Sequence, residues 1–222
     1  MSDLQKDYQH IHNVGSHMFG DWFRAEQKST GLSVLIKGFG GLAEVDFAPH
    51  FEQAVRSWES TSTMSEVELI AHGFSADTGH YLVMPGNFQT LEELVQQHRG
   101  CALARVSEMV KSCCATMRTL HQEGGLWLSF SPSCLLVDPA HFPAKLLRVG
   151  LEPFAGLSRS AWQEHVQGVE EGLRIELAPE LLHGDPEKWG PSADIYGLSS
   201  LVFHLLMGIS IKTSAQQSLS LH

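Results

Sequence analysis

The stretch LHQEGGLWLSFSPSCLLVD, from Leu120 to Asp138, decides the fold. A helical pattern ends at Leu120–His121, two glycines turn the chain, and Ser129–Ser133 leads into the apolar run Cys134–Val137. Glycine and proline at these places indicate a loop between a helix and a short buried strand.

The chain on either side of this loop divides into a strand-rich part and a helical part. Between Tyr8 and Met84, runs rich in β-branched and aromatic residues predict strands at Asp21–Ala25, Ser33–Ile36, Val67–Ile70 and His80–Met84. A helical patch at Pro49–Glu59 interrupts them. From Leu91 onward, apolar residues recur three and four positions apart, as in Leu103–Leu120 and Ile195–Leu205, which predicts helices. Strands followed by helices indicate an α+β fold.

Length, composition and charge limit the kinds of protein that this chain can be. The 222 residues suffice for one sizeable domain or two small lobes. A net charge of -10, from 15 basic and 25 acidic residues, argues against nucleic acid as a partner. The sequence shows no apolar window of about 18 residues for a membrane span, no signal-peptide core and no cysteine pair with zinc-ligand spacing. We therefore expect a cytoplasmic protein with reduced thiols and no bound metal.

Several motifs occur in the order found in protein kinases, and over roughly residues 8 to 208 the chain resembles a bacterial-type Ser/Thr kinase. The matching segments are Gly15–Gly20 (glycine-rich loop), Val34–Lys37 (lysine strand), Tyr81–Met84 (strand entering the hinge), Ala178–Glu180 (A-P-E motif) and Asp194–Leu198 (start of helix F). The resemblance implies a protein kinase-like bilobal fold. Its small lobe, over 1–85, would hold a five-stranded antiparallel sheet and one helix; its helical lobe, over 86–222, would lack the last helices.

The resemblance also implies roles for residues of the small lobe. Lys37 matches the lysine that contacts nucleotide phosphates, and Glu52 is the best match for the glutamate that pairs with it, with Glu59 second. Gly15 and Gly20 would bound the phosphate loop. Met84 would be the gatekeeper, and the hinge would fall at Met84–Asn87.

The loop of the opening stretch aligns without a gap to the kinase motif H-R-D-L-x-P-x-N-I-L. The alignment puts Ser129 in place of the catalytic Asp, Cys134 in place of the metal-binding Asn, and Arg148 in place of the D-F-G Asp. Phosphoryl transfer depends on Mg²⁺ and on a carboxylate that orients the nucleophile. A serine hydroxyl is no base at neutral pH, a thiol is a poor ligand for Mg²⁺, and an arginine repels it. The chain thus resembles a catalytically inactive pseudokinase, with no catalytic residues.

Two residues of this site allow alternative roles. Lys37 could pair with Glu52 for structural reasons or contact a bound anion. Arg148 could form a salt bridge with Glu52 or another acid, or bind phosphates directly in place of the metal. The expected function is a non-catalytic protein-interaction or regulatory module without cofactors. The alternatives are a sensor that binds ATP or another nucleotide without Mg²⁺, and an atypical nucleotidyl or phosphoryl transferase.

The segment that resembles helix F carries two further expectations. Asp194 should cap backbone N–H groups of the catalytic-like loop, as it does in the family, and Glu180, without its usual arginine, should find Arg174 or Lys212. The apolar residues of Ile195–Met207 cover most faces of the helix. We expect a partner protein or a second copy to cover its far side, centred near Phe203. The alternative is that the activation segment folds back over it.

Overall fold

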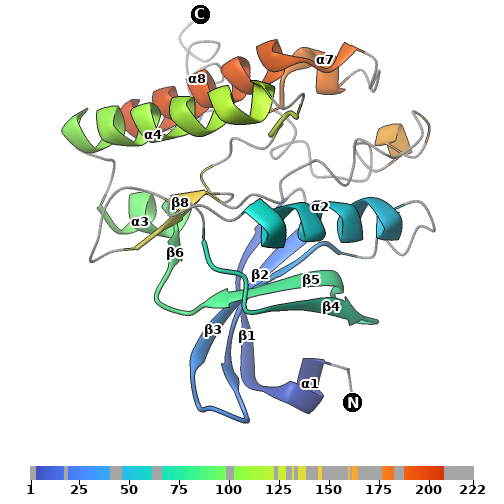
Figure 1. Cartoon of the computed structure of the whole chain (residues 1–222). Helices are drawn as coiled ribbons and strands as arrows, with labels where there is room; N and C mark the ends of the chain where they lie inside the picture. The colour runs from blue at the N-terminus through green and yellow to red at the C-terminus, as the bar shows by residue number, and fades with distance from the viewer. Residues whose placement is uncertain are drawn as a thin grey trace, which may run out of the picture.

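The N-terminal part forms a five-stranded antiparallel sheet in the order β1-β2-β3-β5-β4. The computed structural model describes residues 4–17, 20–40, 47–61, 67–98, 103–122, 125–128, 132, 135–138, 145–146, 160, 162–164, 177–182 and 188–207. The strands are β1 (Tyr8–His17), β2 (Gly20–Gln27), β3 (Ser33–Gly38), β4 (Ala71–Ser75) and β5 (Gly79–Pro85). Helix α1 (Leu4–Asp7) precedes the sheet, and α2 (Phe47–Thr61) lies across one of its faces (Figure 1).

The second part is mainly helical. Its helices are α3 (Leu91–His98), α4 (Leu103–Gln122), α7 (Pro179–Leu182) and α8 (Pro191–Met207), and a small sheet joins β6 (Gln89–Thr90), β7 (Leu135–Val137) and β8 (Lys145–Leu146). The long helices α4 and α8 pack against each other on the far side of α2 from the sheet (Figure 1). An antiparallel sheet followed by helices confirms the expected α+β class.

One predicted strand is wrong. Val67–Ile70 has strong β propensity, yet it has no regular secondary structure, and β4 begins only at Ala71. The side chain of Val67 is buried in the core and the N–H of Ile70 donates to the carbonyl of Val83. Strand formation follows pairing and packing more than intrinsic preference, so the segment Ala71–Ser75 pairs with β5 despite its glycine and serine.

The two faces of the sheet belong to two different cores. On one face, Val34, Ile36 and Val83 pack with Leu4 and Tyr8 beneath α1. The face bearing Trp22, Leu35, Leu82 and Met84 packs against α2 through Phe51, Val55 and Trp58, and its cluster continues into Leu128, Leu136, Trp162, Leu181 and Ala193. A single core therefore joins the sheet to the C-terminal part across the predicted boundary at residue 85.

Candidate functional site

Asp194 organises the loop that the sequence singled out. Its carboxylate lies in the first turn of α8, fully buried, and accepts hydrogen bonds from two successive backbone N–H groups. The N–H of Trp127 donates to Oδ2 at 3.0 Å and the N–H of Leu128 donates to Oδ1. His121, at the end of α4, lies 2.8 Å from Oδ2 through its Nε2. The backbone capping expected of Asp194 is thus present, with His121 as a further partner.

These contacts hold the loop in an unusual backbone conformation. Leu128 has a φ of 60°, in the left-handed region that residues other than glycine seldom adopt. Its side chain is buried in the core shared with α2, and its N–H is held by Asp194. The buried carboxylate and the packed leucine therefore hold the backbone conformation just before Ser129.

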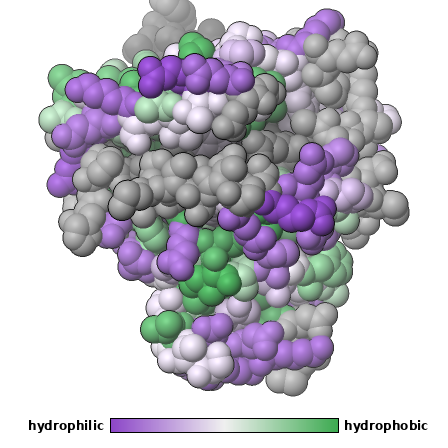
Figure 2. Space-filling model, viewed as in Figure 1, coloured by the Kyte–Doolittle hydropathy of each residue, from purple (hydrophilic) through white to green (hydrophobic). Residues whose placement is uncertain are grey.

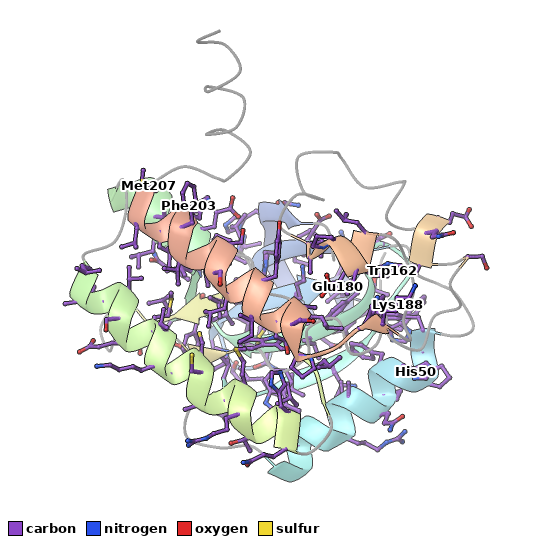
Figure 3. All side chains as sticks on the ribbon, turned by 90° about the horizontal axis from the view of Figure 1, so that it is seen from above. His50, Trp162, Glu180, Lys188, Phe203 and Met207 are labelled. Atoms are coloured by element: carbon purple, nitrogen blue, oxygen red, sulfur yellow. The ribbon has the colours of Figure 1, made fainter. Side chains whose placement is uncertain are left out.

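The three degenerate positions themselves lie outside the described residues. Ser129, Cys134 and Arg148 are not described, and neither are Arg174 and Lys212, the cations proposed for Glu180. Within the part of the chain that the structure describes, Ser192 donates through Oγ to Oε1 of Glu180 at 3.2 Å. Glu180 is thereby tied to the first turn of α8. Figure 3 labels Glu180 of α7 and the neighbouring Trp162, whose indole N–H donates to the Leu181 carbonyl of α7 at 2.7 Å.

The two glycines that bound the phosphate-loop motif differ sharply in their surroundings. Gly15 pairs with Trp22 across β1 and β2, and a Cβ added to it would meet nothing within 4 Å. Gly20 has a φ of +102°, and a Cβ there would lie 1.9 Å from the carbonyl oxygen of Gly38. Gly20 is thus required by the close approach of β2 to β3, whatever the loop binds.

Lys37 is engaged on the inner face of the sheet. Its side chain is 1% exposed, and its Nζ donates to the carbonyl of Gly20 at 2.9 Å. The ammonium also lies 5.3 Å from the centroid of the Trp22 ring and 5.9 Å from that of Phe39, which are cation–π distances. A buried ammonium needs such partners, because water no longer solvates its charge.

The acids proposed as partners of Lys37 lie elsewhere on α2. Oε1 of Glu52 is 4.0 Å from Nδ1 of His72 on β4, and Oε1 of Glu59 is 3.8 Å from Nε2 of the same ring. The side chain of Glu52 is 43% exposed, whereas Lys37 is buried. Glu52 and Glu59 thus join α2 to β4 through His72, and the predicted Lys37–Glu52 pair stays a prediction.

Aromatic and aliphatic side chains fill the sheet face around Lys37. Trp22 pairs across the strands with Lys37, and Leu35 pairs with Met84, the predicted gatekeeper. Trp22, Leu35 and Met84 are at most 1% exposed, and they belong to the same cluster as Leu128 and Leu136 of the other part. These three side chains are therefore covered and offer no open surface to a ligand.

Sequence reasoning missed Arg24, which links the sheet to the first helix beyond it. From β2, its Nη1 donates to the carbonyl of Gly86 and its Nη2 to that of Phe88, both at 3.0 Å. Nη2 also lies 3.5 Å from Oε2 of Glu93 on α3. Glu93 in turn accepts the N–H of Thr90 at 2.8 Å, while Thr90 Oγ1 accepts the N–H of Glu93, a reciprocal helix cap. An arginine in the middle of a strand, on the inward face, was the available signal.

Comparisons with known proteins assign the chain to no family. No protein-family model matches the sequence, and no curated protein matches it significantly. In the described part of the chain, no group of three or more His, Cys, Asp or Glu side chains is arranged to hold a metal ion. Nor does any described helix have the length and apolar character needed to cross a bilayer.

Proposed function

We propose that the chain is a pseudokinase: a kinase-like, bilobal module, divided near residue 85, that binds other proteins and does not transfer phosphate. The observation that carries the proposal is the capping of the Trp127 and Leu128 N–H groups by Asp194. A buried helix F aspartate that caps the loop is what the resemblance requires. It supports the alignment in which the next residue, Ser129, stands at the catalytic position.

The chemistry of the aligned positions supports the absence of transfer. Ser129 offers a hydroxyl where a carboxylate would orient the nucleophile, and Cys134 and Arg148 replace the two magnesium ligands. Transfer relies on an orienting carboxylate and on bound Mg²⁺, and these three substitutions remove the carboxylate and both magnesium ligands. The apolar outer face of α8 supports the binding role, because exposed apolar surface of this kind marks protein contacts.

The contacts of Lys37 weigh against the nucleotide-sensor alternative. Its ammonium already has a carbonyl and two aromatic rings as partners, and Trp22 and Leu35 are buried beside it in the core. Binding a nucleotide would first break these contacts. We therefore expect no cofactor, with or without Mg²⁺.

A thermal-shift titration with ATP separates the three functions. The scaffold predicts an unchanged melting temperature with ATP alone and with ATP plus Mg²⁺. A shift that does not need Mg²⁺ would favour the sensor, and one that needs Mg²⁺ would favour the transferase.

In a parallel assay with radiolabelled ATP, the natural chain and Ser129→Asp should both transfer no label, because Arg148 remains at the metal position. Label transfer that disappears in Lys37→Ala would overturn the proposal.

A further inference from the structure

The ring of His72 lies between two carboxylates where β4 meets α2. His72 pairs across the strands with the buried Leu82, so its side chain is on the face of the sheet that α2 covers (Figure 1). Its Nδ1 lies 4.0 Å from Oε1 of Glu52, and its Nε2 lies 3.8 Å from Oε1 of Glu59. Because the two glutamates are about two helical turns apart, a single ring spans both turns of α2.

Neither ring nitrogen is hydrogen-bonded to the carboxylate beside it. Both distances exceed the upper limit of about 3.2 Å for an N–H···O bond. The buried Nδ1 atom of His72 has no hydrogen-bond partner among the described residues. A neutral imidazole has one N–H donor and can serve one carboxylate, whereas a protonated ring has two donors and a positive charge. Two carboxylates on opposite nitrogens therefore suit the protonated ring.

The charges around His72, among the described residues, are these two carboxylates and one guanidinium. Arg56 lies between the glutamates on α2, one turn from each, and its side chain is exposed. From β5, His80 packs on Phe51 with 4.7 Å between ring centroids, and His72 lies 6.5 Å from the same ring. Strand β4 carries no other ionisable side chain. The described surroundings of His72 thus favour a positive charge.

Apolar contacts hold one side of α2 on the sheet at any pH. They involve Phe51, Val55 and Trp58, and the outward surface of the helix is hydrophilic (Figure 2). The contact along β4 is different, because it depends on a group that titrates. The side chain of His72 is 29% exposed, so its proton can exchange with water, and the two carboxylates are half exposed. Water therefore screens their charges only in part.

We propose that His72 is a proton-dependent latch between α2 and the edge strand β4. The protonated ring pairs with both Glu52 and Glu59 and fixes α2 on the strand, while the neutral ring leaves at least one of them unbound. An imidazole ordinarily gains its proton near pH 6.5, and glutamates keep their charge down to about pH 4.3. The latch therefore closes between about pH 7.5 and 5.5. It rests on the contacts of α2 with β4, and not on the kinase-like alignment or the proposed function.

Hydrogen exchange of the α2 amides tests the latch in three chains that differ only at residue 72. His72→Gln never carries a charge, and His72→Lys carries one throughout this pH range. At about pH 8 the natural chain should match His72→Gln. At about pH 5.5 its α2 protection should approach that of His72→Lys, roughly three- to ten-fold higher, as half-exposed ion pairs allow. Comparison at equal pH cancels the opposite contribution of His80, whose pKa burial lowers.

Two controls separate the latch from a general change of stability. The amides of α4, on the far side of α2 from the sheet (Figure 1), should differ less among the three chains than those of α2. The double variant Glu52→Gln/Glu59→Gln, which leaves His72 in place, should lose the gain in acid, whereas Arg56→Gln should keep it. A natural chain that follows His72→Gln at both pH values would refute the latch. A gain that persists without the two carboxylates would refute it as well.

Discussion

Asp194 combines a buried negative charge with three neighbouring donors. Two backbone N–H groups and the ring of His121 surround its two oxygens, and hydrogen bonds to a charged acceptor are stronger than neutral ones. The N–H groups of Trp127 and Leu128 are buried as well. Without the carboxylate, they would lack both a partner and water.

Asp194→Ala should lower the free energy of unfolding by at least about 3 kcal/mol, since two buried N–H groups lose a charged acceptor. Urea denaturation measures the change. The control is Asp77→Ala, because Asp77 is exposed in the turn between β4 and β5; its effect should stay within about 0.5 kcal/mol. Equal effects of the two substitutions would show that the cap is dispensable.

His80 makes stability depend on pH. Its ring lies 4.7 Å from that of Phe51 and 5.5 Å from that of Phe47, and Nδ1 has no hydrogen-bond partner among the described residues. Burial lowers the pKa of His80 below its ordinary 6.5, and the nearby charge of Glu52 opposes this shift. Because the unfolded chain then binds the proton more readily, the contribution of His80 is present above pH 6.5 and is lost as the pH falls below it.

His80→Phe should therefore flatten the dependence of unfolding free energy on pH between about 7.5 and 5.5. The contribution of His204, whose pKa burial also lowers, remains in the variant. Guanidinium titrations at several pH values give the slope. An equally steep slope in His80→Phe would refute the assignment.

At the scale of elements, the β1–β2 hairpin shows which glycine of the glycine-rich motif the fold itself requires. The close approach of β2 to β3 excludes a side chain at Gly20, whereas the space at Gly15 is open. The sequence presents both glycines as members of one motif. Of these two glycines, only Gly20 is required by the space that the structure leaves.

Gly20→Ala should cost about 3 kcal/mol or more, because its Cβ would overlap the Gly38 carbonyl and its φ is positive. Gly15→Ala should be neutral or slightly stabilising, since alanine loses less backbone entropy than glycine on folding. Thermal unfolding of the pair is the measurement. If Gly15→Ala instead destabilised as much as Gly20→Ala, the described hairpin register would be wrong.

The elements of this fold were predictable where one periodicity dominates. The pattern of Leu103–Leu120 predicted α4, and the run at His80–Met84 predicted β5, because each buries one continuous set of apolar residues. The observed partners of Lys37 and Glu52 were not predictable. Spacing along the chain does not reveal that Lys37 turns toward Gly20 and two rings, while Glu52 reaches His72 on another strand. The capping role of Asp194 could be predicted only because the residue matches the aspartate of the helix F motif.

At the scale of the whole molecule, Arg24 holds the sheet to the helical part at the point where the chain crosses between them. Its guanidinium binds two carbonyls of the connection and one carboxylate of α3. A planar donor group with several N–H vectors can serve three acceptors at once, which an ammonium on a flexible stem does less well. These three contacts tie β2 to the connection and to α3.

Arg24→Lys should lower the free energy of unfolding by about 1–2 kcal/mol. It should also speed hydrogen exchange of the Thr90 amide, whose acceptor Glu93 would lose its cation. Arg118→Lys, at an exposed position of α4, provides the same change of side chain away from these contacts and should alter neither quantity. Unchanged exchange at Thr90 in Arg24→Lys would mean that the helix cap holds the connection without the arginine.

The core that joins the sheet to the helices can be completed only late in synthesis of the chain. It includes Trp22 near one end of the chain and Ala193 near the other, about 170 residues later. At roughly 5–20 residues per second, a ribosome needs on the order of 10–30 s to add that length. Through that interval the sheet and α2 lack the later members of their shared core, from Leu128 to Ala193. The apolar surface that these later residues will cover is where a chaperone would bind the nascent chain.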